Sequence, residues 1–115
     1  MVNIKRAPRN TYLALAKVYD LASNTDIGYL GNISTGGFML FANQDLPHQA
    51  LRIFAIDFPH PDKGNITIQL GARVAWRVKD PQKPKQVNVG CEIRAIEPLD
   101  RLVLLQSANA YGSAA

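Results

Sequence analysis

The sequence predicts a small all-β protein, a six-stranded antiparallel β-barrel followed by one C-terminal α-helix. Three observations favour this fold class. Segments in which apolar and polar residues alternate recur along the chain, as expected for strands with one buried face. Turn-forming groups separate these segments, and they read SNTD, ANQDLP, PHPDKG and KDPQKPK. Only the segment that follows Glu97 has helical spacing, so the strands are expected to close on themselves with one helix added.

Six strands are expected in chain order. The clearest is residues 65–78, NITIQLGARVAWRV, in which every second residue is apolar. Gly71 lies near its middle and predicts a bulge or bend. Residues 86–96 alternate in the same way, with Cys91 on the apolar side. The other four candidates alternate less regularly, and they are residues 11–21, 27–31, 37–42 and 50–58.

The helix is expected over about residues 98–110. Pro98 suits the first helical position, where its missing N–H is not needed, and Asp100 lies where a negative charge favours the helix dipole. Gly112 is the expected end, and residues 113–115 are expected to fray. Helical spacing predicts an apolar face that packs on the sheet, formed by Leu99, Leu102, Val103 and Gln106.

The composition is that of an ordinary globular domain. The chain has 115 residues, 47% of them apolar and 19% charged, which suits one core and not two. No apolar run approaches the roughly 18 residues that a membrane span needs, and the N-terminus lacks the apolar stretch of a secretory signal. Cys91 is the single cysteine, so no internal disulfide is expected. Together these features predict a cytoplasmic protein.

Positive charge is concentrated in two regions of a chain whose net charge is +4. Residues 1–17 contain four basic residues and no acidic one, and residues 73–94 contain six basic residues against two acidic ones. Such clusters suit an anionic partner, whether a nucleotide, a nucleic acid or an acidic protein surface. Solubilising surface charge is the alternative interpretation.

No arrangement of residues indicates catalysis or a metal site. His48 and His60 lie in expected loops without a carboxylate or cysteine at ligand spacing. Cys91 is expected in the core, with no basic neighbour to activate its thiol. Ser34 lacks the Gly-x-Ser-x-Gly surroundings of a hydrolase nucleophile, and no phosphate-binding loop of the Walker type occurs. The sequence therefore predicts a binding protein, not an enzyme, with no metal and no cofactor.

Two motifs together resemble the PilZ domain family. One is the polar segment Asn32-x-Ser34-x-x-Gly37, which lies between two expected strands. The other is the basic leader upstream, which contains Lys5, Arg6 and Arg9. The family signature combines R-x-x-x-R in a leader with [D/N]-x-S-x-x-G between two strands. The order of the later strands and of the terminal helix also matches, so the resemblance covers essentially the whole chain.

PilZ domains are bacterial receptors for cyclic di-GMP, and the resemblance implies that this second messenger is the ligand here. Arg9 matches the second arginine of the family pair, Lys5 stands in place of the first, and Arg6 is displaced from it by one residue. The second motif is complete. The resemblance implies that the guanines and phosphates are held by Lys5, Arg6, Arg9, Asn32, Ser34, Gly36 and Gly37.

These residue types suit such a ligand. An arginine can meet O6 and N7 of guanine together, stack on a base or pair with phosphate. Asn32 can accept from a guanine N–H, and Ser34 can donate to a phosphate. Gly36 and Gly37 allow close approach of the backbone and a positive φ. The alternative is an ordinary hairpin turn in which Asn32 and Ser34 bond the local backbone.

Three residues of the strand at 65–78 are further candidates for ligand contact. Arg73 and Arg77 lie on its polar side, where plain exposure to solvent is the competing interpretation. Trp76 lies on its apolar side, where a place in the barrel core competes with a role as a stacking surface for a base.

The predicted organisation is a flexible basic leader at residues 1–10 and a PilZ barrel with its helix at residues 11–112. Ligand binding is expected to order the leader and so change the surface that a separate protein partner meets. The family implies a partner in motility, pilus or exopolysaccharide machinery. One alternative is a degenerate PilZ adaptor that does not bind the nucleotide, which the lysine at position 5 favours. A barrel that binds single-stranded nucleic acid is ranked last, because the aromatic residues are scattered and mostly on apolar sides.

Overall fold

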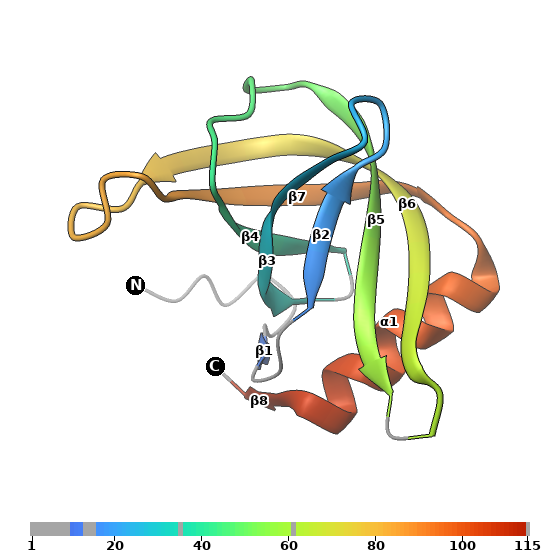
Figure 1. The fold of residues 1–115 in the computed structure, drawn as a ribbon. Helices are drawn as coiled ribbons and strands as arrows, with labels where there is room; N and C mark the ends of the chain where they lie inside the picture. Colours follow the sequence, from blue (N-terminus) through green and yellow to red (C-terminus); the bar gives the residue numbers. More distant parts are fainter. Residues whose placement is uncertain (1–9, 13–15, 35, 61, 115) are drawn as a thin grey trace.

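The fold consists of short strands, one long strand pair and a single C-terminal helix (Figure 1). The computed structural model describes residues 10–12, 16–34, 36–60 and 62–114, and the leader with Lys5, Arg6 and Arg9 lies outside them. The elements are β1 (Asn10–Tyr12), β2 (Lys17–Asp20), β3 (Thr25–Ile33), β4 (Gly37–Ala42), β5 (Leu51–His60), β6 (Gly64–Lys79), β7 (Val87–Ile96), α1 (Pro98–Tyr111) and β8 (Gly112–Ala114).

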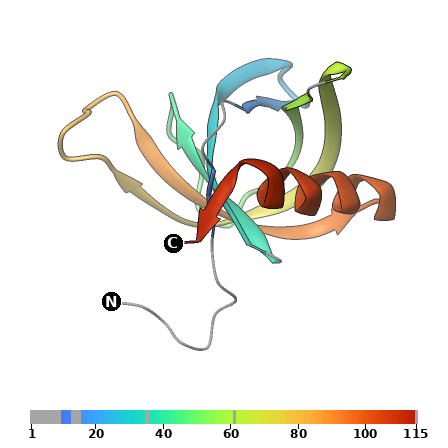
Figure 2. The same cartoon turned by 90° about the horizontal axis from the view of Figure 1, so that it is seen from below.

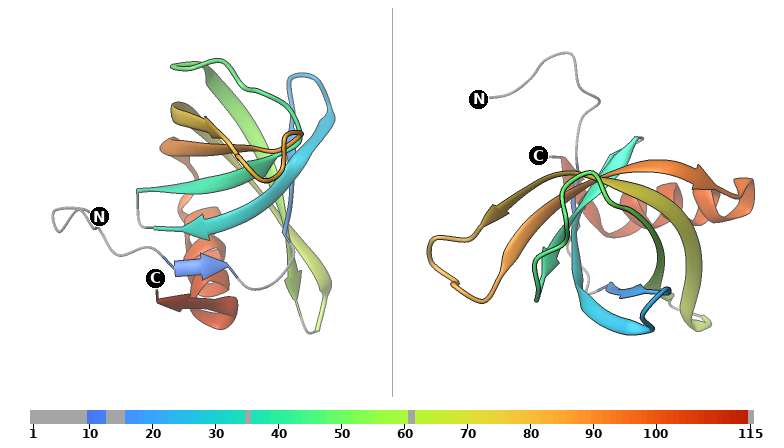
Figure 3. Two further views of the ribbon diagram at one scale, coloured as in Figure 1. Left: turned by 90° about the vertical axis from the view of Figure 1, so that its left-hand side faces the viewer. Right: turned by 90° about the horizontal axis from the view of Figure 1, so that it is seen from above.

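Six of the strands form a closed antiparallel barrel. Their order is β2-β5-β6-β7-β4-β3, and β2 pairs back to β3 (Figure 3). The predicted six-stranded barrel with one helix is therefore confirmed. The expected strand at residues 11–21 is instead two elements, of which β2 belongs to the barrel. Because β1 pairs with the outer edge of β3 at Asn10↔Ile33 and Thr11↔Asn32, it brings the start of the described chain beside the polar motif.

The core fills the barrel with the side chains that alternate inward. Phe38, Phe54 and Phe58 are almost fully buried, and the rings of Phe38 and Phe54 meet edge to face with centroids 6.0 Å apart. Each such side chain contributes about 1.5–3 kcal/mol by leaving water. Buried Asp20 accepts a 2.6 Å hydrogen bond from Arg52 of β5, which satisfies this carboxylate where the barrel closes.

Two register shifts interrupt the pairing of β6 with β7, and the second decides which side chains at the end of β6 face outward. The first shift lies at the predicted position, between Gly71 and Ala72, but its extra residue is Arg94 of β7, so the inward alternation of Leu70, Ala72 and Val74 continues through it. A second shift between Val74 and Trp76 leaves Ala75 as an extra residue. One extra residue reverses the faces of all that follow. Trp76 and Val78 therefore leave the apolar side on which the sequence placed them, and Val78 is 58% exposed.

Helix α1 lies across one end of the barrel (Figure 2) and contacts β6, β1 and β8. It begins at Pro98 as predicted, and the Asp100 carboxylate accepts a 3.2 Å hydrogen bond from the Gln69 backbone. The predicted packing face is wrong for three of its four members, since Leu99 is 76% exposed, Leu102 is 50% exposed and Gln106 is also exposed. The inward face is formed by Leu104, Ser107 and Ala108.

The segment after α1 forms a strand and not the frayed end that the sequence predicts. The helix ends at Tyr111 and Gly112 begins β8, which pairs with β1 at Thr11↔Ser113. Fraying is therefore wrong for residues 113 and 114, because β1 offers them a free strand edge. No helix in the described part of the chain is long and apolar enough to cross a membrane.

Candidate functional site

The turn between β3 and β4 carries the polar motif and is closed by its own backbone. The Ser34 N–H donates to the Gly37 carbonyl at 2.8 Å, and the Ser34 hydroxyl donates to the same oxygen at 3.3 Å. The Gly36 carbonyl accepts from the Ile93 N–H at 2.9 Å, which ties the turn to β7. The hydroxyl contact is longer than the usual 2.5–3.0 Å of an O–H···O bond, so it is weak.

The two glycines of the turn differ in what surrounds them. A Cβ on Gly37 would lie 2.2 Å from the Cys91 carbonyl oxygen, so only glycine lets β4 approach β7 here. The positive φ expected for Gly37 is not found, and the need for glycine is steric. A Cβ on Gly36 would meet no described atom within 4 Å, so the backbone at Gly36 is open to an approaching ligand.

Asn32 lies on the outer face of β3. It is half-buried and pairs in register with Met39 of β4 on one side and with Thr11 of β1 on the other. Its side-chain amide approaches the Met39 sulfur at 3.9 Å. Arg9 immediately precedes β1, so the leader joins the barrel beside Asn32, although Arg9 itself lies outside the described residues.

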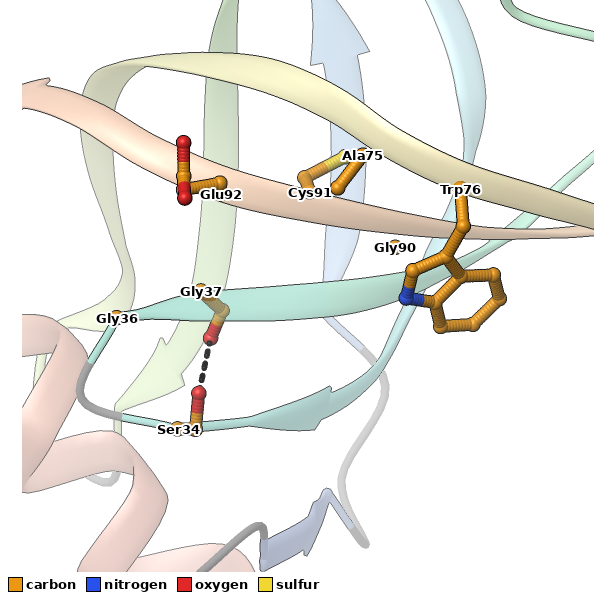
Figure 4. A pocket seen from close by; sticks show the side chains of 8 residues that line it. All are labelled: Ser34, Gly36, Gly37, Ala75, Trp76, Gly90, Cys91 and Glu92. Carbon is orange, nitrogen blue, oxygen red and sulfur yellow. Dashed lines mark hydrogen bonds between the residues drawn. The ribbon is translucent and has the colours of Figure 1, made fainter. Parts of the chain in front are cut away.

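Trp76 reaches this outer face from β6, and the indole lies against Gly90 of β7 (Figure 4). A Cβ on Gly90 would fall 2.1 Å from the indole Cε2 atom, so the ring occupies the place of a side chain at position 90. Because Trp76 pairs with Gly90, Gly90 with Met39 and Met39 with Asn32, these four residues form one continuous row across β6, β7, β4 and β3. We call this the motif row.

A half-open pocket of about 190 Å³ lies between the glycine turn and the indole (Figure 4). Its walls are formed by Ser34, Gly36, Gly37, Ala75, Trp76, Gly90, Cys91 and Glu92. Sites that enclose a whole drug-sized ligand have about 300–1,000 Å³. The pocket is therefore smaller than a site of that kind, and a larger ligand would need a further wall.

Two ionisable side chains line the pocket, those of Cys91 and Glu92, and their pKa values are shifted in opposite directions. Burial raises the pKa of the Cys91 thiol to about 12, so the thiol stays protonated at neutral pH. Hydrogen bonds from Arg94 and then Arg73 lower the pKa of the Glu92 carboxyl, which stays charged at the rim. Neither motif identified Glu92. Its place beside Gly37 follows from the β4–β7 register, which leaves no local signal in the sequence.

The two candidate arginines of β6 do not line the pocket. Arg73 pairs with Glu92 at 3.3 Å and donates to the Gln49 side chain. Arg77 pairs with Asp45 at 2.9 Å. Both are therefore held by neighbouring groups, and Arg73 reaches the pocket only through the Glu92 carboxylate.

The loop at residues 43–50 supports the bulge that presents the indole. Beyond Leu51↔Arg73 the strand β6 has no β5 partner, and the loop takes over. The Gln49 N–H donates to the Val74 carbonyl at 2.9 Å, and His48 Nε2 lies 3.0 Å from the Ala75 carbonyl oxygen. Leu46 of the same loop is 1% exposed and anchors it in the core.

Aromatic side chains gather on the outer face instead of being scattered. Tyr29 and Phe41 pair in register and are each 39% exposed, one row away from Trp76 and Met39. The expectation that the aromatic residues lie mostly on apolar sides is wrong for these three rings. The bulge explains why Trp76 faces outward. The alternation in β3 and β4 is irregular, so the sequence did not indicate that Tyr29 and Phe41 also face outward.

A family model and solved structures identify the class of this protein. The model of the PilZ domain matches residues 4–109, so the chain belongs to the PilZ family. No curated protein matches the sequence.

Three solved structures share the fold. The inhibitor of motility MotI (DgrA) of Bacillus subtilis aligns with 95% of this chain and 51% of its own at 17% identity and a TM-score of 0.72. YcgR of Escherichia coli in complex with cyclic di-GMP aligns with 95% of this chain and 46% of its own, at 13% identity and a TM-score of 0.68. The PilZ domain of YcgR with cyclic di-GMP gives 14% identity, a TM-score of 0.64 and coverages of 95% and 92%. The chain thus spans about half the length of the first two.

Proposed function

We propose that this protein is a receptor for cyclic di-GMP that acts on a separate protein partner. Family membership supports the ligand, and so do the two YcgR structures with that dinucleotide bound. One observation carries the proposal. The motif row sets Asn32 and the Trp76 indole on one outer surface, beside the open backbone of Gly36.

The chemistry of the pocket fits a purine. The indole of Trp76 offers a flat apolar surface, and stacking of a base on such a ring contributes about 1–3 kcal/mol. The Asn32 amide oxygen can accept from a guanine N–H. The Ser34 hydroxyl makes only a long bond to Gly37, so a phosphate oxygen can compete for it. The Glu92 carboxylate is a further acceptor for the guanine N–H groups.

The leader supplies the missing wall. Cyclic di-GMP has two guanines and two phosphates, more than the pocket of about 190 Å³ can enclose. Thr11 of β1 pairs with Asn32, so the described chain begins beside the motif row, and in the sequence the basic residues Lys5, Arg6 and Arg9 come just before this point. The anionic ligand would draw the leader onto the barrel and change the surface that the partner meets.

The alternative function is an adaptor that does not bind the nucleotide. Two observations favour it: position 5 carries lysine instead of arginine, and the Ser34 hydroxyl already has a backbone partner. MotI, one of the structural neighbours, is described as an inhibitor of motility, which is consistent with action through another protein in either case.

Titration calorimetry distinguishes the receptor from the adaptor. We expect cyclic di-GMP to bind in the micromolar range or tighter, and GTP and GMP, each with one guanine, to compete poorly. Asn32→Ala and Trp76→Ala should weaken binding, whereas Leu99→Ala, on an exposed part of α1, should leave it unchanged. No heat and no NMR shift at concentrations far above micromolar would contradict the receptor and support the adaptor.

A further inference from the structure

A second row of exposed side chains runs beside the motif row. Val78 of β6 pairs with Asn88 of β7, Asn88 with Phe41 of β4, and Phe41 with Tyr29 of β3. The three large side chains of this row are exposed by 58%, 39% and 39% for Val78, Phe41 and Tyr29. We call these three the apolar row. Phe41 and Tyr29 are direct cross-strand neighbours, and the half-buried Asn88 of β7 separates them from Val78 on the same outer face.

The row ends at a hairpin that carries unpaired positive charge. Beyond Lys79↔Val87 the β6–β7 hairpin projects away from the barrel (Figure 3). It presents Lys79, Lys83 and Lys85, all exposed, which we call the lysine arm. None of the three makes an ion pair with any residue that the structure describes. The local acid, Asp80, is used inside the hairpin, where it accepts from the Gln82 N–H at 2.9 Å.

Elsewhere along the row the positive charges are already neutralised. Lys17 lies over the Tyr29 ring at 5.3 Å and pairs with Asp26 at 2.8 Å. Arg77, next to Val78, pairs with Asp45 at 2.9 Å. In the described part of this face, unpaired positive charge is therefore concentrated at the hairpin end, while Phe41, Tyr29 and Asn88 carry no charge and the cations near them are paired.

We propose that the apolar row and the lysine arm form the docking surface for an acidic segment of a partner protein. Apolar side chains of that segment would cover Phe41 and Tyr29, and its carboxylates would pair with Lys83 and Lys85. The inference rests on the proposed function, because it locates where the separate partner acts. Depletion of charge in the centre and polar groups at the rim are typical of protein interfaces.

The charge distribution favours a protein over a nucleic acid or a membrane. A single strand of nucleic acid needs cations that follow its backbone along the aromatic rings. Among the residues that the structure describes on this face, the cations near the rings are neutralised by Asp26 and Asp45, and Lys79, Lys83 and Lys85 lie at one end. An acidic peptide with a few apolar anchors needs only that end charge. An anionic membrane would be attracted by the arm, but Lys17 beside the Tyr29 ring is already paired with Asp26 and adds no free cation for it.

The surface is placed to sense the ligand site. Phe41 and Met39 both pack over Gly31, since a Cβ there would lie 2.6 Å from Met39 Cε and 3.1 Å from Phe41 Cε2. Met39 belongs to the motif row and Phe41 to the apolar row, so the two surfaces share a packed boundary. A nucleotide that displaces the Met39 side chain would therefore also alter the packing of Phe41.

Selection from a random displayed peptide library tests the proposal with the intact protein as bait. Bound peptides should be enriched in aspartate and glutamate next to leucine or aromatic residues. A synthetic peptide of the enriched sequence is then titrated against the protein by NMR, with oligo-dT and phosphatidylglycerol vesicles as the competing probes. We expect shifts centred on Tyr29, Phe41 and Val78 with the peptide and weaker effects with the other two.

Matched variants locate the site. Lys83→Glu and Phe41→Ser should each weaken peptide binding by about tenfold or more. Lys63→Glu in the β5–β6 turn and Leu51→Ser at the far end of β5 make the same chemical changes elsewhere and should have no effect. The affinity of each variant for cyclic di-GMP is measured in parallel by calorimetry. Loss of nucleotide binding and loss of peptide binding are thus distinguished.

Four results would overturn the inference. The first is no enrichment over a control bait, and the second is enrichment of basic peptides. The third is equal loss of binding in the two control variants. The fourth is tighter binding to oligo-dT or to vesicles that depends on the same residues, which would assign the surface to nucleic acid or to membrane.

Discussion

Replacing Gly90 with alanine should displace the indole of Trp76 without unfolding the barrel. The new Cβ would lie 2.1 Å from Cε2, 2.2 Å from Nε1 and 2.6 Å from Cζ2 of the ring. Ordinary contact begins at 3.4 Å, so the ring must move outward by about 1 Å or more. Gly90 has no positive φ, so alanine fits its backbone, and the cost arises from the clash.

The expected loss of ligand affinity follows from the stacking of a base on the indole. If the indole supports a guanine, its displacement removes a stacking contact worth about 1–3 kcal/mol, which weakens cyclic di-GMP binding about 5- to 150-fold. The ring can move into solvent at the pocket edge, so we expect the free energy of unfolding to fall by no more than about 1–3 kcal/mol, the usual range for overpacking.

Fluorescence and calorimetry measure the two consequences. Trp76 is the only tryptophan of the chain, so its emission maximum and its quenching by acrylamide report on this ring alone. Both should shift in Gly90→Ala before any ligand is added. The matched control is Gly71→Ala, in the same pair of strands but outside the pocket, where a Cβ would make ordinary contact with the Ala95 Cβ at 3.6 Å. Unchanged emission and unchanged binding in Gly90→Ala would refute the role of the indole, and an equal loss in both variants would show a non-specific effect.

Three other predictions concern the leader and the buried thiol. Arg9→Ala should weaken cyclic di-GMP binding by about 1–3 kcal/mol with little change in melting temperature; earlier melting with intact binding would make Arg9 structural. Lys5→Arg should tighten binding by about 1 kcal/mol, because a guanidinium can bridge O6 and N7 of guanine; no gain there, with loss in Arg6→Ala, would show that Arg6 occupies the site. The folded-state pKa of Cys91 is raised from 9.0 to about 12, so stability is full below pH 9 and falls as pH rises toward 12. Urea unfolding should show a shallower decline over this interval in Cys91→Ala, and identical declines would contradict the assignment.

Much of the barrel was predictable because alternation is a local consequence of strand geometry. In β6 and β7 the inward residues of a closed sheet leave a period of two that is typical of strands. The irregularity near Gly71 and the helix start at Pro98 were predictable for the same reason, because each depends on the backbone of its own segment. The complete motif of Asn32, Ser34 and Gly37 likewise pointed to a ligand site without any knowledge of the fold.

Other features depend on partners far away in the chain and so leave no local pattern. The bulge at Ala75 exists because β6 must pair with Gly90 on one side and with the loop at residues 43–50 on the other. That single inserted residue turns Trp76 from a core position to the wall of the pocket. The inward face of α1 was misassigned because helical spacing gives the period of a stripe but not which stripe meets the barrel. Strand β8 forms because β1 offers it an edge.

The amino-acid sequence thus specified the fold class, the family and the two motifs, since each rests on residues close together in the chain. The surroundings of those motifs were set by register between distant strands: Trp76 over Gly90, Glu92 beside Gly37, and Phe41 beside Tyr29. Register is a property of paired backbones, and one inserted residue reverses the face of every side chain beyond it. For that reason the pocket and the apolar row became visible only when the strands were placed side by side.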